Sequence, residues 1–371
     1  MTVSIKKIAI STGGGDAPGL NAVIKAAVTT AIQKGWECVG IRDGYNGLLF
    51  PERYVNGGVV PLGMAQVQRI TPLGGTILGS TNKGNPLKYV QKNADGTVTE
   101  TDMSDKLLSA IAAHNIDAVV SVGGDGSLSI AYELYQKGLR IVGVPKTIDN
   151  DLERTVVTFG FDTAVAFATE CIDRLHTTAQ SHGRLMVVEV MGRYAGWIAL
   201  YAGIAASADV VLIPELPYDI NAVAKHLREK ILPTKQYGIV VVAEGALPKN
   251  GALTLVENIT GGTQRLGGIG EKVAAQLQQL CEAESRAVVL GHLLRGGSPT
   301  PHDRIISLRF GAAAVRALAA GENGVMVAID PPDMYCVPLA EVSRRQKLVN
   351  VQSDTVITAR ELGICFGDEP I

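Results

Sequence analysis

Three carboxylates, those of Asp125, Asp149 and Asp151, stand in two polar turns near the middle of this 371-residue chain. The first turn reads Gly-Gly-Asp-Gly-Ser, and the second reads Pro-Lys-Thr-Ile-Asp-Asn-Asp. Glycines let backbone N–H groups approach an anion closely, but a carboxylate among those amides repels a phosphate unless a metal ion bridges the two. The two turns therefore predict a site for a nucleotide or another phosphate together with Mg2+.

Each turn follows an apolar run typical of a buried strand, at Ala118–Val122 and at Arg140–Val144, and a helical stretch, Leu128–Lys137, lies between the runs. This order predicts a β-α-β unit, whose parallel strands bring both turns to one edge of a sheet. In open parallel sheets the ligand crevice lies beyond that edge. We therefore expect the three carboxylates, Lys146 and several glycine amides to converge there.

The rest of the chain alternates short apolar runs with helical stretches, from a predicted strand at Lys7–Ser11 to a predicted helix at Arg304–Ala320. This alternation predicts an α/β protein with mainly parallel sheets flanked by helices, and a chain of this length favours two lobes over one. Residues 50–105 look less regular and include a hairpin-like turn at 93–96, and Val337–Ile371 has no assignable pattern.

The composition limits the classes of partner. A net charge of −2 gives no electrostatic basis for binding nucleic acid or a membrane surface. No apolar run approaches the roughly 20 residues of a membrane helix, and the polar N-terminus leads directly into a strand, which predicts no signal peptide. The five cysteines are dispersed without a CxxC motif, which predicts reduced thiols and a cytoplasmic location, and the six histidines have no metal-ligand spacing.

The two central turns resemble those of the 6-phosphofructokinase family, in which GGDG and TIDND motifs carry the chemistry. Three further stretches are similar to family motifs and occur in family order: a first glycine turn at 14–21, and turns at 191–196 and 291–299 that resemble its substrate turns. A GGDG motif alone is a weak signal, whereas several such motifs in order are specific.

The resemblance implies phosphoryl transfer from MgATP to the 1-hydroxyl of fructose 6-phosphate, a step of glycolysis, in a cleft between two lobes. The nucleotide and Mg2+ lobe would comprise residues 1–160 and 294–345, and the sugar-phosphate lobe residues 161–293 and 346–371. Such an enzyme would act as a homodimer or homotetramer.

The family pattern also implies a role for each matching residue. Asp149 would be the general base, Arg193 would stabilise developing charge, and Asp125 would ligate Mg2+. Taken alone, an Asp-Asn-Asp sequence would by default be an Asx turn or a helix cap. The full set of implied residues is, for catalysis, Gly14, Thr147, Asp149 and Arg193; for the phosphoryl donor, Gly14, Tyr45, Asn82, Lys83, Gly124, Asp125, Gly126, Ser127 and Lys146; and for the sugar phosphate, Thr147, Asp149, Asp151, Arg184, Met191, Gly192, Arg193, Glu244, Arg286, His292 and Arg295. Arg184 and Arg286 would reach the site of a neighbouring subunit.

The phosphoryl donor depends on two positions. Family members that use ATP usually have Gly both after the GGD sequence and before TIDND, whereas those that use pyrophosphate usually have Asp and Lys. This chain has Gly126 and Lys146. Gly126 leaves space where an Asp side chain would crowd and repel an α-phosphate, and a lysine does not repel a nucleotide, so we expect ATP, with pyrophosphate as the alternative. Asn82, followed by Lys83, stands where many ATP-dependent members carry Arg.

Lys25, Thr29 and His176 stand where bacterial members carry arginines for an allosteric nucleotide, which predicts weak or absent control by ADP and phosphoenolpyruvate. Three other classes of protein remain as alternatives. The substrate-like turns argue against an NAD or lipid kinase that shares the GGDG motif. The presence of the catalytic carboxylates argues against a regulatory subunit without activity. The lack of a GxGxxG motif argues against a dehydrogenase.

Overall fold

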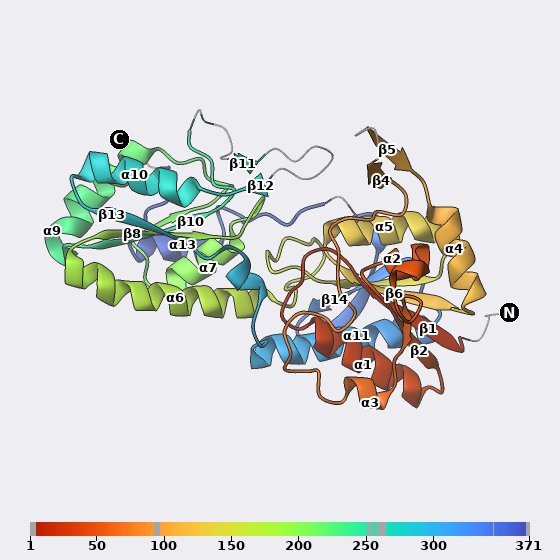
Figure 1. Ribbon diagram of the computed structural model, residues 1–371. Helices are drawn as coiled ribbons and strands as arrows, with labels where there is room; N and C mark the ends of the chain where they lie inside the picture. The colour runs from red at the N-terminus through yellow and green to blue at the C-terminus, as the bar shows by residue number, and fades with distance from the viewer. Residues whose placement is uncertain are drawn as a thin grey trace. The chain divides into compact units, whose positions relative to one another are not determined.

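The computed structural model describes residues 5–92, 97–249, 251, 255–257, 265–343 and 345–368. The chain divides into two compact units (Figure 1). Unit 1 comprises Met1–Ile148, Leu152–Asp162 and Arg295–Gln346, and unit 2 comprises Asp149–Asp151, Thr163–Leu294 and Lys347–Ile371. Asp149–Asp151, which the resemblance assigned to the first lobe, lies in unit 2, where the backbone N–H of Lys347 donates to the carbonyl of Asp151 at 2.9 Å.

Unit 1 is built on a seven-stranded sheet with the order β15-β14-β7-β6-β1-β2-β3. The inner strands are parallel, and both edge strands are antiparallel to their neighbours. The strands are β1 (Lys7–Thr12), β2 (Glu37–Ile41), β3 (Val59–Pro61), β6 (Ala118–Gly123), β7 (Ile141–Pro145), β14 (Val325–Asp330) and β15 (Asp333–Pro338).

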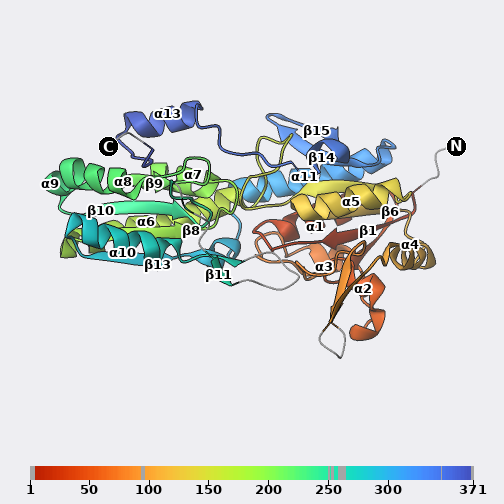
Figure 2. The same cartoon turned by 90° about the horizontal axis from the view of Figure 1, so that it is seen from above.

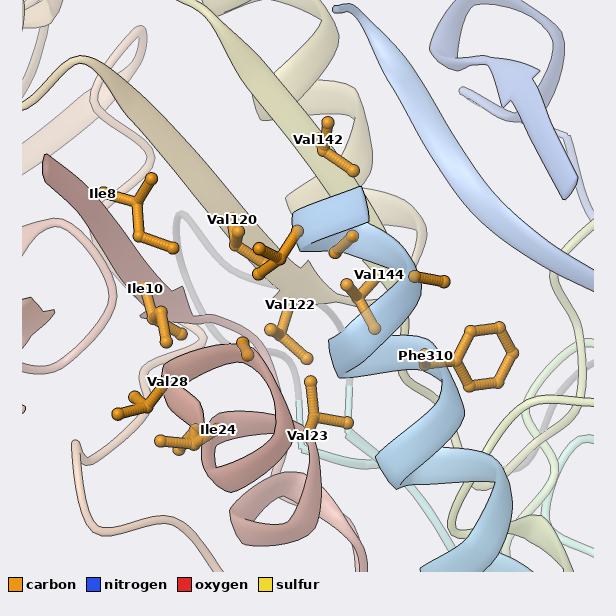
Figure 3. Packing of buried hydrophobic residues seen from close by; sticks show 14 of the residues in the cluster. Ile8, Ile10, Val23, Ile24, Val28, Val120, Val122, Val142, Val144 and Phe310 are labelled. Atoms are coloured by element: carbon orange, nitrogen blue, oxygen red, sulfur yellow. The ribbon is translucent and has the colours of Figure 1, made fainter. Parts of the chain in front are cut away.

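Helices cover both faces of this sheet, because the apolar strands alternate their side chains between the faces. Ile8 and Ile10 of β1 pack against α1 (Leu20–Gln33) and α11 (Pro301–Ala319), as Figure 3 shows. Ala9 points to the other face, which is covered by α4 (Ser104–Ala113), α5 (Asp125–Gln136) and α12 (Leu339–Val342). The remaining short elements of unit 1 are α2 (Asn46–Leu49), the 3-10 turn Pro51–Arg53, α3 (Met64–Val67), β4 (Tyr89–Lys92) and β5 (Val98–Thr101).

Unit 2 contains a four-stranded parallel sheet with the order β13-β8-β10-β9 (Figure 2). One face packs against α8 and α10, and Val211 on the opposite face lies against Gly203 of α7. The strands are β8 (Leu185–Val190), β9 (Val210–Leu212), β10 (Gly238–Ala243) and β13 (Ser285–Val289), with β11 (Leu255–Glu257) and β12 (Arg265–Leu266) as a separate pair. The helices are α6 (Phe161–His182), α7 (Trp197–Ala205), α8 (Ile220–His226), α9 (Leu232–Lys235), α10 (Ile269–Cys281) and α13 (Asp354–Glu361), with a π-helical stretch at Leu227–Ile231 and a 3-10 turn at Gly291–Arg295.

The predicted α/β class with mainly parallel sheets flanked by helices is confirmed. One boundary matters for the site: α5 begins at Asp125 and not at Leu128 as predicted, so part of the Gly-Gly-Asp-Gly-Ser turn is the first turn of a helix. Glycine and small polar residues such as those at 125–127 are typical of a loop, but here they follow the extended Gly124 and form the first turn of α5.

The segment that had no assignable pattern also has regular structure. It contains the end of β15 and the helices α12 and α13, and farther along Cys365 forms a bridge with Val210 at the edge of the second sheet. The turn at 93–96 lies outside the described residues, although β4 and β5 on either side of it pair antiparallel. None of the helices among the described residues is both long and apolar enough to cross a bilayer.

Candidate active site

The first glycine turn and the turn after β6 lie side by side because β1 and β6 are neighbouring parallel strands. The N–H of Gly13 donates to the carbonyl of Val122 at 2.9 Å. A Cβ on Gly13 would lie 2.7 Å from Ser127 Oγ, and a Cβ on Gly123 would lie 2.2 Å from Ser127 Cβ. Ser127 thus occupies the space that side chains at both glycines would need, which explains why the two turns require glycine.

Asp125 is the first residue of α5, and it is half-buried. The free N–H groups at a helix start, together with the helix dipole, attract an anion. Gly126 follows in the same turn and is exposed, and a Cβ placed there would meet nothing within 4 Å. The helix start therefore places a half-buried carboxylate next to a glycine that faces open space.

Lys146 follows β7 and is only 3% exposed. Its backbone N–H donates to the carbonyl of Gly123 at 2.9 Å, which joins the starts of the two central turns. Its ammonium donates to the carbonyl of Gly15 and lies 3.3 Å from the place that a Cβ on Gly14 would take. The buried cation thus contacts the glycine turn directly, and its positive charge lies beside Gly14 and Gly15.

The glycine turn also carries a second layer of contacts. The hydroxyl of Ser80 donates to the carbonyl of Gly14 at 2.5 Å, and the N–H of Gly14 donates to the carbonyl of Thr81 at 3.0 Å. Gly14 has a φ of 78°, in the left-handed region that favours glycine. A pocket of about 320 Å³ lies here, and its lining comprises Gly14, Gly15, Asp16, Gly75, Thr76, Ser80, Thr81 and Asn82. Our sequence analysis did not assign Ser80 and Thr81, although they precede Asn82 directly.

Arg295 belongs to unit 1, where it lies against the glycine turn. Its Nη1 donates to the carbonyl of Asp16 at 3.2 Å and lies 2.8 Å from the place that a Cβ on Gly15 would take. Arg295, which the resemblance implies for the sugar phosphate, therefore contacts the two residues that follow Gly14 in the first glycine turn.

Tyr45 and Lys83 differ in burial. Tyr45 is 6% exposed and packs in the apolar core beneath the sheet, with its hydroxyl 3.5 Å from Ser121 Oγ, and burial raises its pKa to about 12. A ring in this position cannot stack on an adenine, and we leave Tyr45 out of the proposed site. Lys83 is exposed at the surface.

The donor set of unit 1 is of the kind that Mg2+ uses. Most Mg2+ ions in proteins are held by one or two carboxylates together with the phosphate oxygens of a substrate. Asp125 offers one carboxylate beside the open space at Gly126. No group of three or more His, Cys, Asp or Glu side chains in the described ranges is arranged as a complete metal cage. The residues present therefore fit a Mg2+ ion that arrives with its nucleotide.

In unit 2, two turns meet at the carboxyl ends of the neighbouring parallel strands β8 and β10. The N–H of Glu244 donates to the carbonyl of Val190 at 2.9 Å, and the N–H of Gly245 donates to the carbonyl of Gly192 at 3.1 Å. A Cβ on Gly245 would lie 2.0 Å from the carbonyl oxygen of Arg193, so this close approach requires glycine. Four implied sugar-phosphate residues, Met191, Gly192, Arg193 and Glu244, thus lie together.

His292 lies in the exposed 3-10 turn that follows β13. Because β13 pairs with β8 in parallel, this turn extends from the same edge of the sheet as the Met191 turn. Thr147 and the carboxylates of Asp149 and Asp151 are half-buried. Asn150 between those carboxylates is 5% exposed and has a φ of 51°.

Arg184 and Arg286 lie at the amino ends of the unit 2 strands, at the edge of the sheet opposite the Met191 turn. Arg184 precedes β8 and Arg286 is the second residue of β13, so about 20 Å of strand separates them from the Met191 turn. Both arginines bind Glu284: Arg184 Nε lies 2.7 Å from Glu284 Oε2, and Arg286 Nη2 contacts Glu284 Oε1. The hydrogen bond from Arg184 lowers the pKa of Glu284.

The positions of the family's effector arginines hold residues that make contacts within their own unit. These contacts are Lys25 Nζ to the carbonyl of Gln68 at 3.3 Å, the hydroxyl of Thr29 to Met64 Sδ at 3.7 Å, and His176 Nε2 to the carbonyl oxygen of Ala206 at 2.7 Å.

Glycine turns and a helix start at the ends of parallel strands are typical of α/β proteins that bind phosphates. The phosphofructokinase family model matches residues 7–318 of the chain. An ATP-dependent 6-phosphofructokinase of Chloroflexus aurantiacus is 50% identical over 364 residues, which cover 98% of each protein. A pyrophosphate–fructose 6-phosphate 1-phosphotransferase of Amycolatopsis mediterranei is 47% identical and covers 93% of this chain and 97% of its own length.

Among solved structures, the phosphofructokinase of Pichia pastoris in the T-state aligns with a TM-score of 0.74 and 31% identity over 97% of this chain. This chain spans 37% of the length of that protein. The chain therefore belongs to the phosphofructokinase family.

Proposed function

We propose that the protein is an ATP-dependent 6-phosphofructokinase, which transfers the terminal phosphoryl group of ATP to the 1-hydroxyl of fructose 6-phosphate as a step of glycolysis in the cytoplasm. One observation carries the choice of donor: the open space at Gly126, where a Cβ would meet nothing within 4 Å. An α-phosphate beyond the transferred group needs such space, which an aspartate would fill with negative charge. The ATP-dependent relative at 50% identity supports this choice.

In this proposal the residues of unit 1 hold the nucleotide. The amides of the first glycine turn and of the start of α5 donate to phosphate oxygens, and the ammonium of Lys146 adds positive charge beside Gly14. Asp125 ligates Mg2+, which would neutralise phosphate charge when bound. Such donors stabilise the charge on the oxygens of the transferred group, and the protein forms no covalent bond to that group.

The residues of unit 2 bind the sugar and move the proton. Asp149 accepts the proton of the 1-hydroxyl as that oxygen forms its bond to the terminal phosphorus and the bond from phosphorus to the ADP oxygen breaks. Arg193 stabilises the charge that develops on the phosphoryl oxygens. Glu244 accepts hydrogen bonds from sugar hydroxyls, and His292 donates to the 6-phosphate.

We also propose that the enzyme is a homodimer or homotetramer in which Arg184 and Arg286 bind the 6-phosphate in a neighbouring subunit's site. Their place at the sheet edge opposite the Met191 turn supports this arrangement. Both are partly exposed, at 30% and 54% of their side chains, so a partner's ligand can reach them.

The test is phosphorylation of fructose 6-phosphate with Mg2+ and either ATP or pyrophosphate, in the wild type and in Gly126→Asp. We expect activity with ATP alone, and a large loss of ATP affinity in Gly126→Asp. The pyrophosphate alternative rests on Lys146 and on the relative at 47% identity. Activity with pyrophosphate alone, unaffected by Gly126→Asp, would establish that alternative, and inactivity with both donors would favour a regulatory subunit.

A further inference from the structure

The C-terminal segment Lys347–Val349, which we call the strap, contacts the turn that carries Asp149. The backbone N–H of Lys347 donates to the carbonyl of Asp151 at 2.9 Å, and its Nζ donates to Asn150 Oδ1 at 3.0 Å. One residue of the strap therefore holds both residues that follow Asp149. These contacts lie within unit 2.

Asn150 is a sensitive point of this turn. Its φ of 51° lies in the left-handed region, which Asn visits more readily than most residues but which still costs free energy. It is also 5% exposed, so its side-chain amide needs partners inside the protein. The bond from Lys347 favours this backbone conformation, and the conformation determines the direction of the preceding Asp149.

Trp197 anchors the strap to α7, the helix that follows the turn at 191–196, which carries both Met191 and Arg193 and is called the Arg193 turn below. The indole N–H of Trp197 donates to the carbonyl of Lys347 at 2.9 Å, and the ammonium of Lys347 lies 5.7 Å from the centre of the indole ring. Trp197 is the first residue of α7, directly after Gly196. The strap is thus fixed to a helix and not only to the turn that it supports.

Glu215 provides a second anchor. Its carboxylate accepts from the N–H of Val349 at 2.8 Å and from the N–H of Gly196 at 3.1 Å. A Cβ on Gly196 would lie 2.4 Å from Ile213, so the end of the Arg193 turn is tightly packed. Through Glu215 the strap and the Arg193 turn share one carboxylate.

We propose that the strap positions the two catalytic turns of unit 2, and that Lys347 is a positioning residue which acts on Asp149 through Asn150. The expected effect on kcat rests on the proposed function, whereas the expected effect on the order of the Asp149 turn does not. A catalytic base that shifts by about 1 Å can cost about 100-fold in rate, even when substrates still bind. The strap therefore sets kcat more than substrate affinity.

The kinetic experiment compares Lys347→Met, which loses the donor and the charge, with Lys347→Arg, which keeps both. We expect Lys347→Met to lower kcat about 10- to 100-fold with unchanged KM for both substrates, and Lys347→Arg to recover part of the loss. Lys249→Met is the matched control. Lys249 Nζ also donates to the C-terminal segment, but to the carbonyl of Asp368 at 3.4 Å and not to the Asp149 turn. An equal loss in Lys249→Met, or no loss in Lys347→Met, would overturn the proposal.

The path through Asn150 has its own test. Asn150→Gly removes the acceptor but tolerates the positive φ. If Lys347 acts through Asn150, adding Lys347→Met to Asn150→Gly should lower kcat little further, whereas independent effects would multiply. Multiplying effects would refute this path.

A measurement that needs no activity separates this inference from the proposed function. Amide hydrogen exchange in a peptide spanning residues 148–152 should be faster in Lys347→Met than in the wild type and in Lys249→Met. An unchanged exchange rate would refute the strap even in a fully active enzyme. Faster exchange in a protein inactive with both donors would support the strap and refute the proposed function.

Discussion

Gly123→Ala and Gly126→Ala are neighbouring substitutions for which the structure predicts opposite results. A Cβ on Gly123 would lie 2.2 Å from Ser127 Cβ, whereas ordinary carbon contacts are about 3.5–4.0 Å. Ser127 belongs to the first turn of α5, so the helix start has to move or the turn has to open. A Cβ on Gly126 meets nothing within 4 Å.

Overpacking of this kind costs about 1–3 kcal/mol, and each kcal/mol lowers Tm by about 2–4 °C in a domain of 150–250 residues. We therefore expect Gly123→Ala to lower Tm by about 2–12 °C and to raise KM for ATP, because the displaced residues carry the amides to which the proposed function assigns phosphate binding. Gly126→Ala should keep or slightly raise stability, because Ala favours a helix over Gly by up to about 1 kcal/mol.

The assay is thermal and urea unfolding together with ATP saturation kinetics for each variant. The double variant Gly123→Ala with Ser127→Gly removes the clashing Cβ and should regain stability relative to Gly123→Ala alone. A wild-type unfolding midpoint for Gly123→Ala, or no recovery in the double variant, would show that Ser127 does not fill the space between the turns.

Three further predictions concern assembly, pH and control. Mixing inactive Asp149→Asn subunits with Arg286→Ala subunits should restore activity beyond that of either variant, because hybrid oligomers contain sites with both residues intact. If the mixture has only the sum of the two separate activities, Arg286 does not complete a neighbouring subunit's site. Burial raises the pKa of Glu215, even though its carboxylate accepts hydrogen bonds from backbone amides. Between the ordinary glutamate pKa and this raised pKa, the folded protein therefore retains a proton that the unfolded chain has lost. The free energy of unfolding should fall as the pH rises through that interval. Glu215→Gln should flatten this decline in unfolding measured across the weakly acidic range, and an unchanged slope would exclude Glu215 as its source. Saturation by fructose 6-phosphate should be hyperbolic and insensitive to ADP, because the effector-site arginines are replaced, and sigmoidal kinetics relieved by ADP would contradict this.

Periodicity and turn chemistry in the sequence were sufficient to predict the α/β class and most strands. The predicted strands Lys7–Ser11 and Ala118–Val122 differ from β1 and β6 by one residue at the end, because continuous apolar runs between polar turns are typical of strands buried on both faces. The hairpin β14–β15 was not predicted, since a Pro-Pro turn interrupts its pattern and an edge strand has only one partner.

The sequence by itself determined the family and the residues available for chemistry, because these depend on local motifs in a fixed order. It could not give the surroundings of each residue, which depend on contacts between distant segments. The resemblance implied Tyr45 for the phosphoryl donor, but its ring is buried in the core, and the contact of the Lys146 ammonium with the carbonyl of Gly15 joins residues that are distant in the sequence. The bond from Lys347 to Asn150 joins residues 197 positions apart, so only the tertiary structure could assign the C-terminal segment to the turn of the proposed base.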